Sequence, residues 1–412
     1  MILRAVVSSM VLLAASPALA ITPSQICSGD PCVVDGDVLI DAGGSADFGS
    51  ELRVRAGARV LLATSDLVEL RAGHIVVEGR AQIRALVAGV DLVVGTTGGT
   101  IEIGDPERRA RLDLRDARSV EVHSGSVGGV AGELFVNAVI DARSSRTGGS
   151  VYLSGSTVTV AGRVRVDAKR DGGDFVVEGE SLVVDAPISA NGEDGGVVEI
   201  DAYTGSAEVR KPIRARGRGE FCFGGGVRIY AERPVALSDV DVSGRAVGCI
   251  GGDIDVFSPE GISSKGTLTS RGGIRDGSGG FVGVASWGPL TVDGIQASGG
   301  SGGDVALEGQ RIDVLGSVVS QGAGGDFGWD GTVDLLAECG LRIAPRARLD
   351  TRHASEAFFE MLLESGGTID IAGTVTSSGE IEIVHPAGIP PMITGRVSPS
   401  PTFVVGATAP CG

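Results

Sequence analysis

The fold of this chain is constrained most by a repeat in its sequence. The repeat opens with two adjacent glycines and continues with three short stretches in which apolar residues alternate. It is clearest from 148 to 196, where GGSVYLSGSTVTVAGRVRVDAKRD is followed by GGDFVVEGESLVVDAPISANGED and then by a third glycine pair. Alternation with a period of two is typical of a strand with one buried face, and self-similarity at a spacing of roughly 20 to 30 residues is typical of a solenoid. Each copy is therefore predicted to form one turn of a parallel β-helix.

The apolar positions of the repeat are predicted to point inward and to stack in ladders of like side chains. In two consecutive copies these positions are Val151, Leu153, Val158, Val160, Val164 and Val166, then Phe175, Val177, Leu182, Val184 and Ile188. The glycines are predicted to form the corners between sheets, where a positive φ is common. The predicted fold is all-β, a single-domain parallel β-helix of about fourteen coils with three short strands per coil.

The ends of the chain carry different signals from the repeat. Arg4, an apolar stretch and the small residues at 18–20 are typical of a secretory signal peptide, which predicts a periplasmic, cell-surface or extracellular location. No later stretch approaches the roughly 20 apolar residues that a transmembrane helix needs. The predicted divisions are a signal peptide at 1–20, an N-terminal cap at 21–37, the β-helix at 38–395 and a C-terminal tail at 396–412.

The charge and composition exclude some function classes. The net charge is -17, from 52 acidic and 35 basic side chains, so the surface repels phosphate backbones and nucleic acid is not an expected partner. Aromatic residues make up only 4% of the chain, which fits a narrow core of small aliphatic side chains.

The six cysteines favour disulfides over a metal site or a catalytic thiol in a chain predicted to be exported. Cys222 and Cys249 each stand two residues before a glycine pair, hence at the same point of consecutive copies. Stacked strands are about 4.8 Å apart, inside the Cα separation of about 4.4 to 6.8 Å that a disulfide requires, so these two are predicted to pair. The remaining predicted pairs are Cys27 with Cys32, from their proximity, and Cys339 with Cys411, by elimination.

The repeat itself, GG-x-V-x-L, V-x-V-x-G, x-V-x-V-x-A, resembles the repeats of filamentous haemagglutinin-like adhesins and other bacterial exported parallel β-helix proteins. The resemblance covers most of the chain from Gly98 to about Gly379. It implies a rod that serves as a stalk or as an adhesive surface.

The first candidate site is the outward middle position of the first strand in successive copies, occupied by Glu199, Arg228 and Asp255 and flanked by Asp201, Tyr230 and Asp253. Polysaccharide lyases that resemble this fold use clustered aspartates for Ca²⁺ and an arginine as base, which makes the group a candidate site on chemical grounds. The alternative is an exposed ladder of alternating charge, which stabilises by about 0.2 to 1 kcal/mol per pair.

A second candidate joins acids to one of the two tryptophans, at Asp326, Trp329 and Asp330. An exposed ring there would stack on a sugar and the acids would bind Ca²⁺, whereas the alternative is a turn with the ring folded over the edge of the core. The four histidines have no mutual spacing that indicates a metal site.

The sequence therefore predicts an exported structural or adhesin-like β-helical protein of a surface or matrix, without catalysis and without a cofactor unless the acids bind Ca²⁺. The alternative is a polysaccharide-binding or polysaccharide lyase-type β-helix. The expected partners are cell-surface or extracellular polysaccharide or protein, and the sequence leaves the oligomeric state open.

Overall fold

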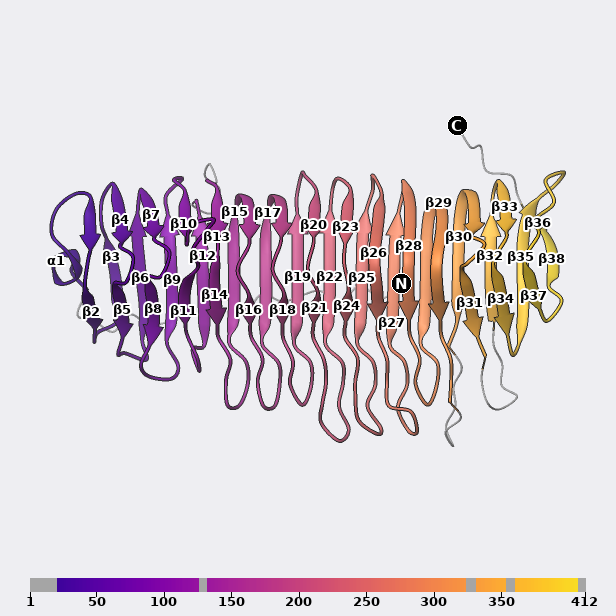
Figure 1. Cartoon of the computed structure of the whole chain (residues 1–412), viewed down its shortest axis with the longest axis horizontal. Coiled ribbons are helices and arrows are strands. Elements are labelled where there is room, and N and C mark those ends of the chain that lie inside the picture. The colour runs from indigo at the N-terminus through magenta and orange to yellow at the C-terminus, as the bar shows by residue number, and fades with distance from the viewer. Residues whose placement is uncertain (1–20, 126–131, 324–330, 353–359, 407–412) are drawn as a thin grey trace, which may run out of the picture.

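The strands of the protein wind into a parallel β-solenoid of about 13 turns, as seen in a computed structural model (Figure 1). The structure describes residues 21–125, 132–323, 331–352 and 360–406. Each strand pairs in parallel with the strand one coil away, so that Val151 lies beside Phe175, and Phe175 beside Val198. The predicted all-β parallel β-helix of about fourteen coils is confirmed.

The coils have three faces, named here A, B and C. Face A contains β1 (Cys32–Val34), β4 (Glu51–Val54), β7 (His74–Val77), β10 (Ile101–Ile103), β13 (Leu134–Val136), β20 (Ala207–Val209), β23 (Val235–Leu237), β33 (Thr368–Ile371) and β36 (Met392–Ile393). Face B contains β2 (Asp37–Ile40), β5 (Arg59–Leu62), β8 (Gln82–Ala85), β11 (Ala110–Asp113), β14 (Ala138–Asp141), β16 (Val164–Arg165), β18 (Ile188–Ser189), β21 (Ile213–Arg214), β24 (Val240–Asp241), β31 (Arg348–Thr351), β34 (Thr374–Ser377) and β37 (Arg396–Ser398).

Face C, which carries the candidate site, contains β3 (Gly44–Asp47), β6 (Leu67–Ala72), β9 (Asp91–Thr96), β12 (Ser119–Ser124), β19 (Val197–Ala202), β22 (Gly226–Ala231), β25 (Asp253–Ser258), β27 (Phe281–Ser286), β32 (Glu360–Ser365), β35 (Glu380–Pro386) and β38 (Thr402–Gly406). Longer strands turn a corner and contribute to two or three faces. These are β15 (Ser150–Val160), β17 (Asp174–Val184), β26 (Ile262–Thr269), β28 (Pro289–Gln296), β29 (Asp304–Val319) and β30 (Val333–Ile343).

The core is the column of alternate side chains inside the coils. Every inward position predicted from the repeat is buried, and Phe175, the largest side chain that is fully buried, lies between Val151 and Val198. Stacking like side chains in register removes apolar area from water at every step along the rod. The alternate positions of the same strands face solvent and are free to carry function.

Two of the glycine pairs serve a different purpose from the one predicted. Neither glycine of the pairs at 172–173 and 251–252 has a positive φ. A Cβ at Gly173 would lie 2.3 Å from the carbonyl oxygen of Gly149, and one at Gly252 would lie 1.8 Å from the carbonyl oxygen of Gly225. The prediction that these glycines supply a positive φ was wrong, because what requires them is the close approach of the neighbouring coil's backbone.

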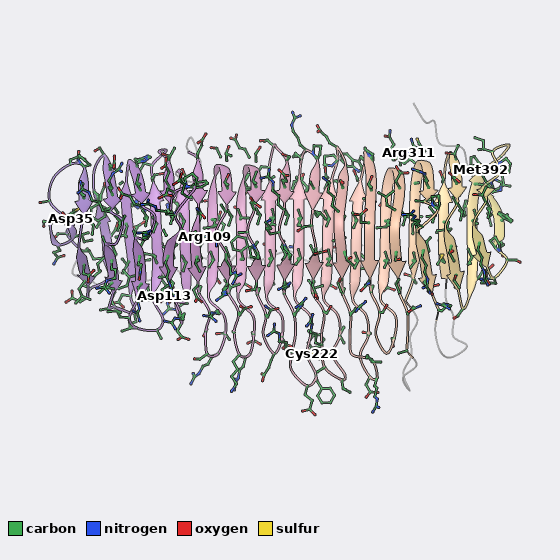
Figure 2. All side chains as sticks on the ribbon, viewed as in Figure 1. Asp35, Arg109, Asp113, Cys222, Arg311 and Met392 are labelled. Carbon is green, nitrogen blue, oxygen red and sulfur yellow. A yellow bond between two sulfur atoms is a disulfide. The ribbon has the colours of Figure 1, made fainter. Side chains whose placement is uncertain are left out.

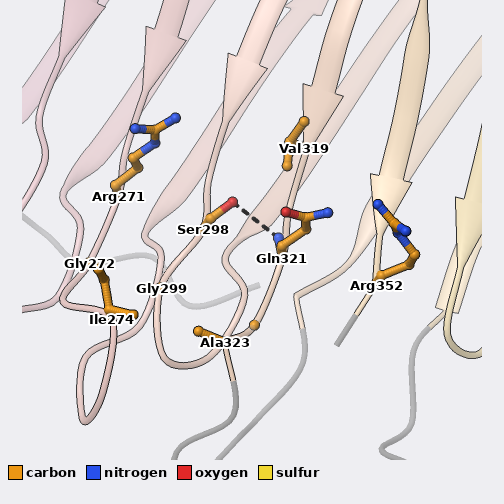
Figure 3. A pocket seen from close by; sticks show the side chains of 10 residues that line it. Arg271, Gly272, Ile274, Ser298, Gly299, Val319, Gln321, Ala323 and Arg352 are labelled. Carbon is orange, nitrogen blue, oxygen red and sulfur yellow. Dashed lines mark hydrogen bonds between the residues drawn. The ribbon is translucent and has the colours of Figure 1, made fainter. Parts of the chain in front are cut away.

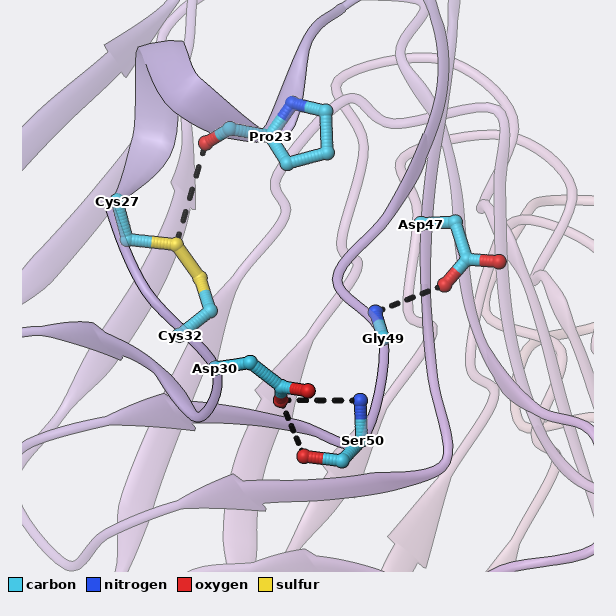
Figure 4. Close-up of a disulfide and its surroundings, with 7 residues drawn as sticks. All are labelled: Pro23, Cys27, Asp30, Cys32, Asp47, Gly49 and Ser50. Carbon is cyan, nitrogen blue, oxygen red and sulfur yellow. Dashed lines mark hydrogen bonds between the residues drawn. A yellow bond between two sulfur atoms is a disulfide. The ribbon is translucent and has the colours of Figure 1, made fainter.

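A short helix and a disulfide close the N-terminal end of the rod. Helix α1 (Pro23–Ile26) buries Ile26 against the first coils, and Cys27 and Cys32 form a disulfide with a Cα separation of 5.6 Å (Figure 4). Next to it, Asp30 accepts a hydrogen bond from the backbone N–H of Ser50 in the next coil, at 3.2 Å (Figure 4).

The solenoid extends past both boundaries predicted for it. Strand β1 lies within the segment predicted as a cap, yet it pairs with β4. Strands β37 and β38 lie within the segment predicted as a tail, yet they pair with β34 and β35. The predicted boundaries at 37/38 and at 395/396 are therefore inside the stack of coils, while residues 1–20, predicted as a signal peptide, lie outside the described residues.

The loops at the corner between faces B and C are the longest, and they project from one edge of the rod (Figures 1 and 2). Cys222 and Cys249 join two consecutive loops of this edge through a disulfide with a Cα separation of 4.5 Å. Cys339 is in a disulfide as well, and Cys411, its predicted partner, lies outside the described residues. In the described part of the chain, no helix is long and apolar enough to span a membrane.

Candidate functional site

The predicted charged ladder is present on face C. Strands β19, β22 and β25 are in register, which places Glu199 beside Arg228 and Arg228 beside Asp255. Arg228 forms an ion pair with Glu199, with Nη1 3.0 Å from Oε1. Both side chains of this pair are exposed, at 68% for Arg228 and 39% for Glu199. The pair by itself therefore contributes little to stability, about 0 to 1 kcal/mol.

Two aspartates of the ladder are in unfavourable surroundings. Burial raises the pKa of Asp255, the neighbouring Asp253 raises it further, and Arg228 lowers it by less. Burial, followed by repulsion from Glu178 and Glu199, raises the pKa of Asp201. The Oδ1 atom of Asp201 is covered and accepts no hydrogen bond from the described residues. The folded chain therefore compensates the charged form of each aspartate poorly.

An aromatic ladder runs beside the acids, and the sequence prediction included only its first member. Tyr230 stacks on Phe257, with ring centroids 5.6 Å apart, and Phe257 meets Trp287 edge to face at 5.7 Å. Trp287 is 69% exposed. Tyr230 and Phe257 are register partners on β22 and β25, so the alignment of copies that placed the acids also contained this signal.

A groove of about 550 Å³ continues the same face toward the N-terminus. Its polar wall is built around Glu178, which accepts hydrogen bonds from the hydroxyls of Tyr152, at 2.6 Å, and of Tyr203. Burial and the bond to Glu178 raise the pKa of Tyr152 to about 12, and the same causes raise the pKa of Tyr203. Both hydroxyls therefore stay protonated at neutral pH.

The hollow of the groove arises where small residues interrupt a column of large ones. Arg71, Gly95, His123, Ser154 and Glu178 follow one another from coil to coil on face C. A Cβ at Gly95 would lie 2.3 Å from Nε2 of His123, so glycine at this position leaves room for the imidazole ring. Burial, and then Arg71, lowers the pKa of His123, so the ring is neutral at neutral pH. The sequence prediction considered the four histidines only as metal ligands and gave His123 no role.

The groove and the two ladders form one continuous surface. Glu178 lies beside Asp201 in register, and Asp201 lies beside Tyr230. We name this surface the acid–aromatic strip, made of Tyr152, Glu178, Glu199, Asp201, Tyr203, Arg228, Tyr230, Asp255, Phe257 and Trp287. Rings that face solvent beside hydrogen-bonding carboxylates are suited to hydroxylated, planar-faced ligands such as sugars.

Metal binding has no support from the arrangement of ligands. Among the described residues, no group of three His, Cys, Asp or Glu side chains is placed to hold a metal ion. Asp253 lies between Gly226 and Phe281 in register, at the edge of the ladder. The second predicted candidate, Asp326, Trp329 and Asp330, lies outside the described residues.

Comparison with known proteins gives no match: no family model, curated protein or solved structure is significantly similar to this chain.

Proposed function

We propose that this chain is an exported β-helical rod that acts as an adhesin-like protein of a surface or matrix. It holds carbohydrate on the acid–aromatic strip and catalyses no reaction. The observation that carries this proposal is the ladder of Tyr230, Phe257 and Trp287, whose rings are in contact on the solvent side of face C next to carboxylates.

The charge of the strip selects among sugars. Carboxylates outnumber cations on this part of face C, where Arg228 is surrounded by Glu199, Asp253 and Asp255. A uronic acid polymer would be repelled by these groups, whereas a neutral or amino sugar would not. The ion pair with Glu199 also occupies the arginine that a lyase mechanism would use as its base.

Tryptophan fluorescence gives a direct test. The chain has two tryptophans, so Trp329→Phe leaves Trp287 as the only reporter. This variant is titrated with laminarin, a neutral glucan, with chitosan oligosaccharides, which are cationic, and with polygalacturonate, which is acidic. We expect the emission of Trp287 to change with a neutral or cationic sugar and to stay constant with polygalacturonate.

The control is Phe403→Ala, which removes an exposed aromatic ring at the far end of the rod and is expected to leave binding unchanged. Tyr230→Ala combined with Phe257→Ala is expected to abolish binding. Constant emission with all three probes would contradict the proposal. Release of unsaturated uronate from polygalacturonate that is lost in Arg228→Ala would favour the lyase alternative instead.

A further inference from the structure

Three consecutive loops at the corner between faces B and C carry more arginines than acids, whereas the chain as a whole is acidic. They are residues 215–225, 242–252 and 270–280, and together they contain five arginines and two acids in a chain whose net charge is -17. We name them the arginine loops. Isolated bridges between Gly217 and Gly244, and between Phe223 and Ile250, keep the first two loops stacked in parallel. The edge is therefore a regular array, positively charged on an acidic rod.

Most of these arginines are available to a ligand. Arg216 is paired with Asp241, and Arg245 lies 3.5 Å from the same carboxylate. Arg218, Arg271 and Arg275 are exposed and form no ion pair with the described residues, although Arg271 donates a hydrogen bond to the neutral Gln296. Guanidinium groups without a carboxylate partner are suited to phosphate.

The tips of the same loops carry large apolar side chains that face solvent. The exposed fractions are 77% for Phe221, 56% for Phe223, 55% for Val247 and 75% for Ile274. The ring of Phe221 lies against Gly248 of the next loop, where a Cβ would be 2.7 Å from it. The disulfide between Cys222 and Cys249 holds these two tips together. Apolar side chains grouped at loop ends, rather than scattered singly, mark an interaction surface.

Hollows lined by arginine lie beside the tips. One, of about 700 Å³, lies between the second and third loops and is lined by Arg245, Val247, Arg271 and Arg275, with Asp241 as its one acid. Another, of about 570 Å³, lies on the other side of the third loop, where Arg271 and Ile274 face Gln321 and Arg352 across it (Figure 3). Each hollow thus combines cationic groups with an apolar side chain.

We propose that the arginine loops dock the rod on an anionic lipid surface. Phe221, Phe223 and Ile274 enter the boundary between headgroups and acyl chains, while the arginines contact the lipid phosphates. Amphipathic surfaces with exposed aromatic and aliphatic side chains flanked by cations bind anionic bilayers in this way. The acidic remainder of the rod is repelled by the same surface, which orients the loop edge toward the lipid.

Two other occupants fit the observations less well. An anionic polysaccharide would use the arginines but would leave the apolar tips in water. A second copy of the chain, docked through the same patch about a twofold axis, would bring two positively charged edges together. Only a lipid surface offers negative headgroups and an apolar layer at the depth of the tips.

Vesicle sedimentation tests the proposal with the whole chain. Vesicles of phosphatidylcholine mixed with phosphatidylglycerol are expected to bind the protein, and vesicles of phosphatidylcholine alone to bind it at least about tenfold more weakly. Phe221→Ser with Ile274→Ser, and separately Arg271→Gln with Arg275→Gln, are each expected to reduce binding to the anionic vesicles by about tenfold or more. The matched control is Leu39→Ser with Arg118→Gln, an exposed apolar residue and an exposed arginine elsewhere on the rod, which is expected to bind as the natural chain does.

A second readout reports insertion without removing the apolar tips. Ile274→Trp, in a chain that also carries Trp287→Phe and Trp329→Phe, is expected to show a blue shift of emission on adding anionic vesicles. No binding to anionic vesicles, or binding that the tip variants leave intact with no blue shift, would overturn the proposal. Binding to heparin but not to vesicles would also overturn it and would make an anionic polysaccharide the partner.

Discussion

The acid–aromatic strip and the arginine loops are built by the same coils, yet they are opposite in character. On the strip, strands in strict register place Glu199, Asp201 and Asp255 on a flat sheet with few cations nearby. On the loops, Arg218 and Arg275 stand beside exposed apolar tips, away from the sheet. A single repeat therefore provides two surfaces of opposite charge, because sheet positions and corner loops vary independently of the buried column between them.

The largest expected effect concerns the corner that both surfaces share. Gly252→Val places a side chain where a Cβ already lies 1.8 Å from the carbonyl oxygen of Gly225, so adjacent coils must separate. We expect a loss of about 3 kcal/mol or more in the free energy of unfolding, measured by urea denaturation. The matched control is Gly226→Val, where a Cβ meets no atom within 4 Å, and a change below about 0.5 kcal/mol is expected there. Equal losses in the two variants would show that the coils are not in close contact at Gly252.

The next effect separates the two surfaces. Cys222→Ala with Cys249→Ala removes a cross-link that spans 27 residues. In the chain-entropy description such a link contributes about 3 kcal/mol, so the midpoint of thermal unfolding is expected to fall. Limited proteolysis is expected to cut first within residues 217–252, while the Trp287 emission of the folded protein, measured in a chain that also carries Trp329→Phe, stays constant. An unchanged midpoint together with unchanged protease resistance would mean that the disulfide does not hold the loops.

Replacing one aspartate at each surface is expected to change the melting temperature at pH 7 in opposite directions. The pKa of Asp255 is raised mainly by burial, so its charged form costs stability once the pH exceeds the pKa of the unfolded chain. Asp255→Asn is therefore expected to raise the melting temperature at pH 7 and to lose this advantage as the pH falls to about 3, below the usual pKa of an aspartate.

The control for this titration is Asp241→Asn at the loop edge. Burial alone would raise the pKa of Asp241, but hydrogen bonds from Arg216 and Ser243 outweigh it and lower the pKa. The charged form therefore contributes stability above the pKa of the unfolded chain, and this stability is lost as the pH falls through the folded pKa. Asp241→Asn is expected to lower the melting temperature at pH 7, with a smaller difference at about pH 3. Shifts of the same sign in both variants would contradict the contrast between the surfaces.

The smallest effect is expected for the exposed ion pair of the strip. Arg228→Gln breaks the contact with Glu199 between two exposed side chains and is expected to cost less than about 1 kcal/mol. Arg216→Gln breaks the contact with Asp241, where both side chains are at most 16% exposed, and is expected to cost more. Chemical denaturation measures the loss of stability in both variants. A larger loss for Arg228→Gln would contradict the expectation that the less exposed pair contributes more.

The fold could be predicted from the sequence because the period-two alternation records burial directly. Val151, Phe175 and Val198 follow one another at almost constant spacing, so the alignment of copies gave their stacking and with it the register of Glu199, Arg228 and Asp255. The role of the glycine pairs at 172–173 and 251–252 was predicted wrongly, because contact between neighbouring backbones leaves no mark in the sequence pattern beyond the absence of a side chain.

Much of the candidate site could not be predicted in the same way. Trp287 follows the end of β27, outside the alternating positions, so the alignment of copies did not join it to Phe257. His123 and Tyr203 lie several coils apart along the rod. They line one groove because small residues lie between them. Side-chain directions at strand ends and in loops depend on local packing, which a repeat pattern does not specify.

Neighbouring coils share one register, which aligns the strip on face C and stacks the first two arginine loops. The rate of disulfide formation between engineered cysteines on face C tests this shared register most directly. Tyr230→Cys with Phe257→Cys joins register partners on adjacent strands, whereas Tyr230→Cys with Asp255→Cys joins positions offset by two residues. We expect rapid cross-linking of the first pair and little of the second, because the distance limit for a disulfide is about 7 Å between Cα atoms. Faster cross-linking of the offset pair would mean that the coils do not share this register.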